Sequence, residues 1–334
     1  MLIFFQLLSM LIVILIAAEI FTNALEHLGE KLGISEGVTG SLFAAVGTAL
    51  PETMVPLVAL LAGTANIKVN EEIGIGAILG APLMLSTLSI SLMSFAVLRQ
   101  RGIHGTFTPE LTGLTRDLNT FLLAFALATL ALYIPHDHTV IHATLAISLV
   151  LIYFIYILLT IRASEDLVAE GHGTEAEGPM LLARIGLPQN IAVIVVQLIL
   201  GVAMLVGGVK GFILGVEAGA KMLGISALLL SLLIIPIATE LPEKVNSILW
   251  IRRRKDTLAF GNITGAMVFQ GTLLPAIGIT LTSWEPRTEI LTGVVLTLVG
   301  TLWIRILLLR SEIKIWHLWF NSALYIIYLT ISLS

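Results

Sequence analysis

Two glutamates stand in matching apolar contexts, each directly after a proline. Glu52 ends the stretch "AAVGTALPE", and Glu243 ends the stretch "IIPIATELPE". Proline has no backbone N–H and clashes with the carbonyl four residues earlier, so Pro51 should free the Gly47 carbonyl and Pro242 that of Ala238. In lipid, a freed carbonyl is tolerated only where protein, water or an ion satisfies it. A carboxylate beside a freed carbonyl therefore predicts a cation site.

Further oxygen donors lie near these glutamates. Thr48 and Thr239 each precede their glutamate by four residues, and Glu240 lies three residues before Glu243, on the same face if the turn is helical. An all-oxygen site with several carboxylates suits Ca²⁺ better than Mg²⁺. Three carboxylates cannot all stay ionised in a dry site without a cation, which makes proton coupling physically easy.

Each candidate also has a purely structural interpretation. A threonine can bond the backbone of its own helix. Asn262 and Gln270, about two helical turns apart, either line the site or hydrogen-bond across helices. A glutamate can pair helices, although the cost of an intramembrane carboxylate favours a function.

The elements that carry these residues are membrane helices. The chain has 334 residues, 57% hydrophobic and only 12% charged, against roughly 25% charged in an ordinary globular domain. Apolar runs of this length predict an all-α polytopic membrane protein with ten transmembrane helices. The predicted spans are 2–24, 36–61, 73–98, 117–134, 139–161, 189–214, 225–250, 258–282, 289–309 and 315–333.

The charge distribution predicts how the chain is threaded. With the N-terminus and C-terminus outside, most Lys and Arg residues fall in inside loops, as the positive-inside rule requires. The acidic segment 162–188 is then a cytoplasmic linker between two halves. The net charge of −4 argues against a nucleic-acid partner, and the absence of cysteine excludes thiolate metal sites.

The two halves repeat each other. Glu52 and Glu243 are 191 residues apart, as are Leu32 and Leu223, and Gly-rich segments follow both motifs at an offset of 185. We predict a first five-helix repeat over 1–161, with its motif region at about 36–98, and a second over 189–334, with its motif region at about 225–282. Because five is odd, the second copy enters the membrane from the opposite side, which gives the inverted-topology repeats typical of secondary transporters.

The motifs "GTALPE" and "ATELPE", followed by "GAILGA" and "GNITGA", resemble the two α-repeats of the Ca²⁺/cation antiporter superfamily. They are more similar to its sodium/calcium exchanger branch, whose repeats read G-T-S-L-P-E. The resemblance implies an antiporter with midplane cation sites. Glu52 and Glu243 would be central Ca²⁺ ligands beside Thr48 and Thr239, and the first and sixth helices would slide across the other eight.

The chain departs from that pattern at several positions. The motif serine is replaced by Ala49 in the first repeat and by Glu240 in the second, and later ligands are replaced by Leu85 and Gln270. Small hydroxyls expected at outer sodium sites are therefore missing, which leaves both Na⁺ and H⁺ open as the driving ion.

The sequence thus predicts a cation antiporter of the cell inner membrane that exports Ca²⁺ in exchange for Na⁺ or H⁺. The candidate cation ligands are Glu52, Glu243, Glu240, Thr48, Thr239, Gly47, Ala238, Asn262 and Gln270. We expect no cofactor other than the transported cations and no required protein partner. The alternatives are an antiporter for another cation, a cation channel, or an intramembrane enzyme. Inverted repeats argue against a channel, and histidines that lie away from the motifs argue against an enzyme.

Overall fold

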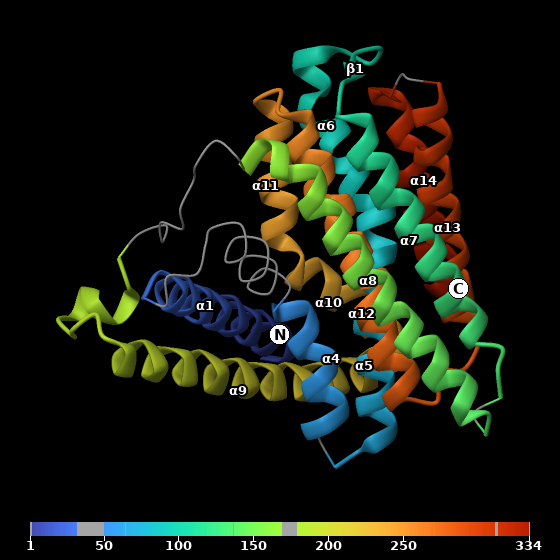
Figure 1. The fold of residues 1–334 in the computed structure, drawn as a ribbon. Helices are drawn as coiled ribbons and strands as arrows, with labels where there is room; N and C mark the ends of the chain where they lie inside the picture. Colours follow the sequence, from blue (N-terminus) through green and yellow to red (C-terminus); the bar gives the residue numbers. More distant parts are fainter. Residues whose placement is uncertain are drawn as a thin grey trace. The chain divides into compact units, whose positions relative to one another are not determined.

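The computed structural model describes residues 2–31, 50–63, 65–135, 137–168, 179–310 and 313–333. This part of the chain is almost entirely helical (Figure 1). Seven of its helical segments are long and apolar enough to cross a membrane, and two shorter apolar helices cover Glu52–Ala62 and Ala227–Ile237. Gly47 and Thr48 lie outside the described residues.

The described helices and strands follow this order along the chain. They are α1 (Leu2–Lys31), α4 (Leu50–Ala62), α5 (Ile67–Met84), the π-helix η2 (Leu85–Ser89), α6 (Ile90–Arg101), β1 (Thr106–Phe107), α7 (Leu111–Ala131), α8 (Thr139–Val168), the 3₁₀-helix η3 (Leu181–Ile185), α9 (Ile191–Leu223), α10 (Ala227–Thr239), α11 (Leu241–Arg252), α12 (Asp256–Leu281), α13 (Thr288–Leu309), β2 (Ile313–Lys314), the 3₁₀-helix η4 (Ile315–Leu318) and α14 (Trp319–Leu333).

Every predicted apolar run overlaps a helix, but not every run is one uninterrupted span. The run 36–61 lies partly outside the described residues. The run 225–250 is divided between α10 and α11, and α14 has only 15 residues. Helix α7 begins earlier than predicted, at Leu111, because the Glu110 carboxylate caps it by accepting hydrogen bonds from the N–H groups of Thr112 and Gly113.

The chain forms two compact units, each built from both halves of the sequence. The first comprises residues 1–70 and 158–227, and the second comprises residues 71–157 and 228–334. The boundaries differ from those of the predicted sequence repeats, because each unit combines segments that are far apart in the chain.

The first unit is organised around α1 and α9, which run side by side (Figure 1). Glycines on α9 let the α1 backbone approach closely, since a Cβ at these positions would lie between 2.8 and 3.1 Å from an α1 side chain. The contacts pair Gly201 with Phe21, Gly208 with Ile14 and Gly215 with Leu7. Both series step by seven residues in opposite directions, so the helices pack antiparallel with a heptad spacing.

Polar side chains fix the same helix pair at one end. Gln197 of α9 donates to Asn23 Oδ1 of α1 at 2.9 Å and to the Ile20 carbonyl at 3.0 Å. Asn23 and Gln197 in turn accept the N–H groups of Leu181 and Leu182, each at 3.0 Å. The end of the linker segment is thereby attached to both helices through η3.

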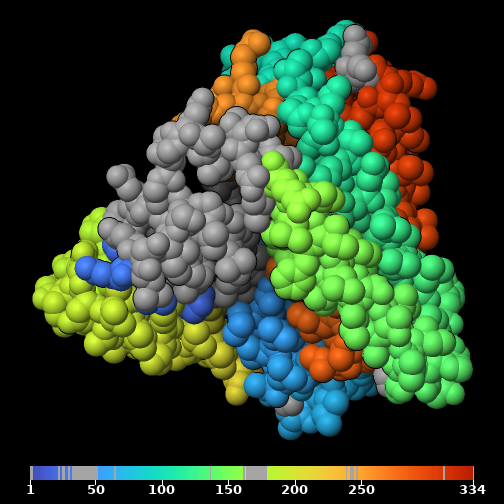
Figure 2. Space-filling view, in the orientation of Figure 1, coloured from blue at the N-terminus to red at the C-terminus, as the bar shows by residue number. Residues whose placement is uncertain are grey.

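The second unit has an apolar core in which α12 packs against α7, α11 and η2. Helix α5 approaches α10 closely, because a Cβ on Gly80 would lie 2.5 Å from the Leu232 carbonyl oxygen. Residues 139–157 of α8 lie on the visible outer face of this unit (Figure 2), where Ile147, Leu151 and Phe154 are more than half exposed. Such an apolar outer face suits lipid rather than water.

Candidate functional site

The second motif interrupts its helix where the sequence predicts it. Helix α10 ends at Thr239, Glu240 adopts φ −90° and ψ 10°, and α11 begins at Leu241 with Pro242 in its first turn. Pro242 can donate no backbone hydrogen bond, so the helix cannot continue regularly through this point. Ala238 lies in the last turn of α10 and Glu243 in the first turn of α11.

Glu240 is fully buried at this interruption, with 0% exposure. Its Oε2 atom lies 3.5 Å from the Nζ atom of Lys244, one helical turn further along. The Lys244 side chain is 7% exposed, and its ammonium also donates to the Pro236 carbonyl at 3.0 Å and contacts the Met84 sulfur of α5. Of the two candidate carboxylates whose burial is described, Glu240 is the more deeply buried, and it has a positively charged neighbour one helical turn away.

Sequence reasoning assigned no role to Lys244 or Met84. Glu240 precedes Lys244 by four residues, and a glutamate at that spacing before a lysine forms a favourable helix pair. That spacing could have identified the pair. Met84 carries no comparable signal, because its place beside the ammonium depends on how α5 packs against the second motif.

Thr239 is buried, and its hydroxyl donates to the Ile235 carbonyl of its own helix at 3.1 Å. This is the backbone-bonding arrangement that the residue type allows. The hydroxyl oxygen keeps a lone pair for a further contact, since a hydroxyl can donate once and accept twice.

The first motif places its glutamate in the same helical position. Glu52 lies in the first turn of α4, and its side chain is 4% exposed. Helix α4 packs against α9 within the first unit. A carboxylate in the first turn interacts favourably with the positive end of the helix dipole.

The two candidates on α12 have different surroundings. Asn262 donates from Nδ2 to the Ser247 hydroxyl of α11 at 3.0 Å, so it bonds across helices. Gln270 is 2% exposed, and its Oε1 atom accepts no hydrogen bond from the part of the chain that the structure describes. A buried carbonyl oxygen of this kind is costly unless something binds it.

In the first repeat, the segment that corresponds to the one around Gln270 contains a π-helical turn, η2. In η2 the Ser86 carbonyl accepts the Nδ2 hydrogen of Asn321 on α14 at 2.7 Å. Such turns are frequent at functional sites because they leave backbone groups available. Asn321 donates to the Gly300 carbonyl as well, at 3.2 Å, and so also holds α13.

Buried charges of the second unit outside the motifs are paired. Arg101 forms a bidentate ion pair with Asp256, at 2.7 and 2.8 Å, and donates to the Ile251 carbonyl. Asp117 of α7 accepts hydrogen bonds from Tyr156 of α8 at 3.0 Å and from Thr264 of α12 at 2.7 Å. These pairs join helices. At the edge of α7, the N–H groups of Gly113 and Thr112 lower the pKa of Glu110.

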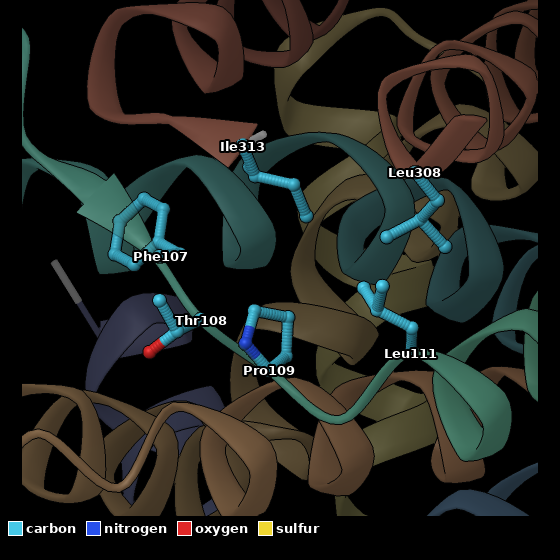
Figure 3. Close-up of a pocket in the computed structure, with 6 residues that line it drawn as sticks. All are labelled: Phe107, Thr108, Pro109, Leu111, Leu308 and Ile313. Atoms are coloured by element: carbon cyan, nitrogen blue, oxygen red, sulfur yellow. The ribbon is translucent and has the colours of Figure 1, made fainter. Parts of the chain in front are cut away.

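Two cavities of the second unit have linings that do not suit an ion. Figure 3 shows one of about 230 Å³ beside the short β1–β2 ribbon, and its lining contains a single polar side chain, that of Thr108. A groove of about 530 Å³ between α8 and α12 is almost wholly apolar. Among the side chains that the structure describes, no three carboxylates or imidazoles lie together as a metal-binding group.

Comparison with known proteins relates these features to transport. The chain matches the family model named "Sodium/calcium exchanger protein" over residues 2–162 and 193–334. It is 26% identical over 277 residues to the inner membrane protein YrbG of Escherichia coli K12, covering 82% of this chain and 78% of that protein.

Solved structures show the same fold. The crystal structure of the H⁺/Ca²⁺ exchanger CAX superposes with a TM-score of 0.70 at 23% identity, covering 99% of this chain and 82% of that one. The sodium–calcium exchanger NCX_Mj superposes with a TM-score of 0.56 at 20% identity, covering 98% of both chains.

Proposed function

The chain belongs to the sodium/calcium exchanger protein family, and on this premise we propose that it exports Ca²⁺ in exchange for Na⁺ or H⁺ by alternating access. It is a cation antiporter rather than an enzyme, and a multi-pass membrane protein. We propose the cell inner membrane as its location. No cofactor beyond the transported cations and no protein partner enters this function.

The proposed architecture is ten transmembrane helices in two inverted repeats, 1–161 and 189–334, with both termini outside and the linker 162–188 in the cytoplasm. The Lys and Arg distribution supports this orientation. The seven long apolar helices, the shorter helices at the two motifs and α14 are together compatible with ten crossings.

One observation carries the proposal. The identical sequence Leu-Pro-Glu begins helix α4 as described, at Leu50, and helix α11, at Leu241. Both copies therefore place a glutamate in the first turn of a helix, next to a proline that deprives an earlier carbonyl of its partner. Paired interruptions in corresponding positions of two halves are the best sequence-level indication of a transporter's substrate site.

We propose Glu52 and Glu243 as the main Ca²⁺ ligands. Oxygen atoms of Thr48, Thr239, Gly47, Ala238, Asn262 and Gln270 complete the candidate ligand set. The buried Oε1 atom of Gln270 supports its inclusion. In Asn262 the amide nitrogen donates to Ser247, and the amide oxygen is the atom that would bind a cation. Glu240, with Lys244 beside it, sets the local charge.

The test is uptake of ⁴⁵Ca²⁺ into proteoliposomes with the membrane potential clamped. One set carries an outward Na⁺ gradient, a second an outward H⁺ gradient, and a third no gradient. Uptake under either gradient that is lost in Glu243→Gln is the expected result. If neither gradient drives uptake while other divalent ions are transported, Ca²⁺ is the wrong substrate.

A further inference from the structure

We infer that the Lys244 ammonium is a tethered cation, occupying a position in the protein interior that an alkali-metal ion would otherwise fill. Glu240 is then a ligand of Lys244 rather than of the transported ion. The inference deepens the proposed function, because it assigns one cation position of the transporter to the protein itself.

Two of the three atoms around the ammonium are oxygens of the kind that coordinate an alkali-metal ion. A carboxylate oxygen lies at 3.5 Å and a backbone carbonyl oxygen at 3.0 Å. The carbonyl is that of Pro236, which also accepts the Glu240 N–H at 3.3 Å. Carboxylate and carbonyl oxygens are the usual donors to hard cations in proteins. The third neighbour of the ammonium is the Met84 sulfur.

Burial makes the positive charge necessary at this point. Glu240 is 0% exposed, and a buried carboxylate whose partner is removed becomes an uncompensated charge inside a low-dielectric interior. A positive charge must therefore accompany Glu240 if it is to stay ionised. Lys244 does so through a four-residue tether, which gives the ammonium a high effective concentration at the carboxylate compared with a dissolved ion.

The second motif carries this charge pair at positions where the first motif has neither charge. At the offset of 191, Glu240 corresponds to Ala49 and Lys244 corresponds to Thr53. Each motif carries the same net charge, because the first has one glutamate and the second has two glutamates and one lysine. The lysine compensates the additional glutamate, so the extra carboxylate contributes no net charge to transport.

The experiment measures the thermal stability of purified protein as alkali chloride replaces choline chloride at constant ionic strength. In Lys244→Met the vacated position should bind an alkali cation and raise Tm by about 2–4 °C in a saturable way, beyond the response of the unmodified protein. Potassium, whose radius is close to that of ammonium, should act at the lowest concentration. Lys244→Arg should keep the unmodified response.

Two variants serve as controls. Glu240→Gln/Lys244→Met removes both charges and should lose the added response. Lys221→Met breaks another Glu–Lys pair at the same spacing, with Nζ 2.9 Å from Glu217, but that lysine side chain is 71% exposed. It should gain no response.

The outcomes separate this inference from the proposed function. If Lys244→Met responds to alkali cations no more than the double variant does, the tethered-cation inference is wrong. If Lys244→Met folds in none of the salts, the inference is also wrong, because a site for an alkali cation must bind such a cation once the ammonium is removed. Neither result depends on Ca²⁺ transport, and absence of ⁴⁵Ca²⁺ uptake in the unmodified protein would affect only the proposed function.

Discussion

The two Leu-Pro-Glu motifs share a glutamate but differ in how its surroundings are charged. The first presents Glu52 in an otherwise uncharged turn, with Thr53 next to it, whereas the second surrounds Glu243 with Glu240 and Lys244. The acidic residues alone suggest that the second motif is the more negative one. When Lys244, which pairs with Glu240, is counted as well, the two motifs carry equal formal charge. A count of carboxylates in a membrane site therefore misleads unless buried cations are counted as well.

The largest effect is expected where the motifs agree. Glu52→Gln and Glu243→Gln should each reduce exchange in proteoliposomes by about a hundredfold or more, since each removes a charged ligand from a desolvated site. Glu285→Gln, at an exposed position between α12 and α13, is the control and should exchange normally. Equal loss from both motif variants supports equivalent roles. Normal exchange by one of them would break the equivalence of the two repeats.

The second-largest effect is expected on stability, at a position where the two motifs differ. In choline chloride, Lys244→Leu should lower the free energy of unfolding by about 3–5 kcal/mol, because it leaves a buried charge uncompensated. Its counterpart in the first motif, Thr53→Leu, should change the free energy by no more than about 1 kcal/mol. Equilibrium unfolding in mixed SDS micelles measures both values. A similar cost for the two substitutions would contradict the asymmetry described above.

The glycine pairs after the motifs offer a smaller contrast. At the offset of 185, Gly80 corresponds to Gly265. A Cβ on Gly80 would meet the Leu232 carbonyl oxygen at 2.5 Å, whereas the nearest atom to one on Gly265 is the Tyr156 hydroxyl at 3.8 Å. Gly80→Ala should therefore cost about 1–3 kcal/mol, and Gly265→Ala should be neutral or stabilise by up to about 1 kcal/mol. Thermal unfolding in detergent distinguishes the two substitutions. Equal changes in Tm would show that Gly80 is not at a tight helix contact.

The smallest expected effect concerns the bond from Asn262 to Ser247. Its counterpart in the first repeat is Ala77, which is buried and apolar. A double-mutant cycle with Asn262→Ala and Ser247→Ala should give a coupling energy of about 0.6 kcal/mol, typical of hydrogen bonds between membrane helices. A coupling near zero, combined with weaker ion binding in Asn262→Ala, would instead assign this residue to the ion path.

The sequence predicted the helical architecture well where the signal is local. Apolar run length located the helices, and Pro242 predicted the interruption between α10 and α11, because the proline acts on its own backbone. The cap at Glu110 is also local, but it lies in a polar stretch before the apolar run and was missed. The roles of Gly47 and Thr48, like those of the other candidate ligands, remain predictions.

The features that could not be predicted depend on contacts between distant segments. The π-turn η2 is accompanied by a bond from Asn321 to Ser86, residues 235 positions apart in the sequence. Similarly, Lys244 reaches Met84, 160 positions away. Hydrophobic periodicity contains no information on such pairs, so a single sequence could indicate the glutamates but not the cation packed beside one of them.

The glycine seam between α1 and α9 has a consequence for biosynthesis. Gln6 donates to the Gly211 carbonyl, 205 residues further along the chain. At a translation rate of about 5–20 residues per second, synthesis of the chain between Gln6 and Gly211 takes about 10–40 s, and α1 lacks its packing partner α9 during this time. During that interval Leu7, Ile14 and Phe21 can rest against lipid without cost, whereas Gln6 and Asn23 lack their final hydrogen bonds. The packing of α1 should therefore be completed only after α9 has been synthesised, and a ribosome stalled before residue 191 should hold an inserted α1 whose polar ends still exchange with solvent.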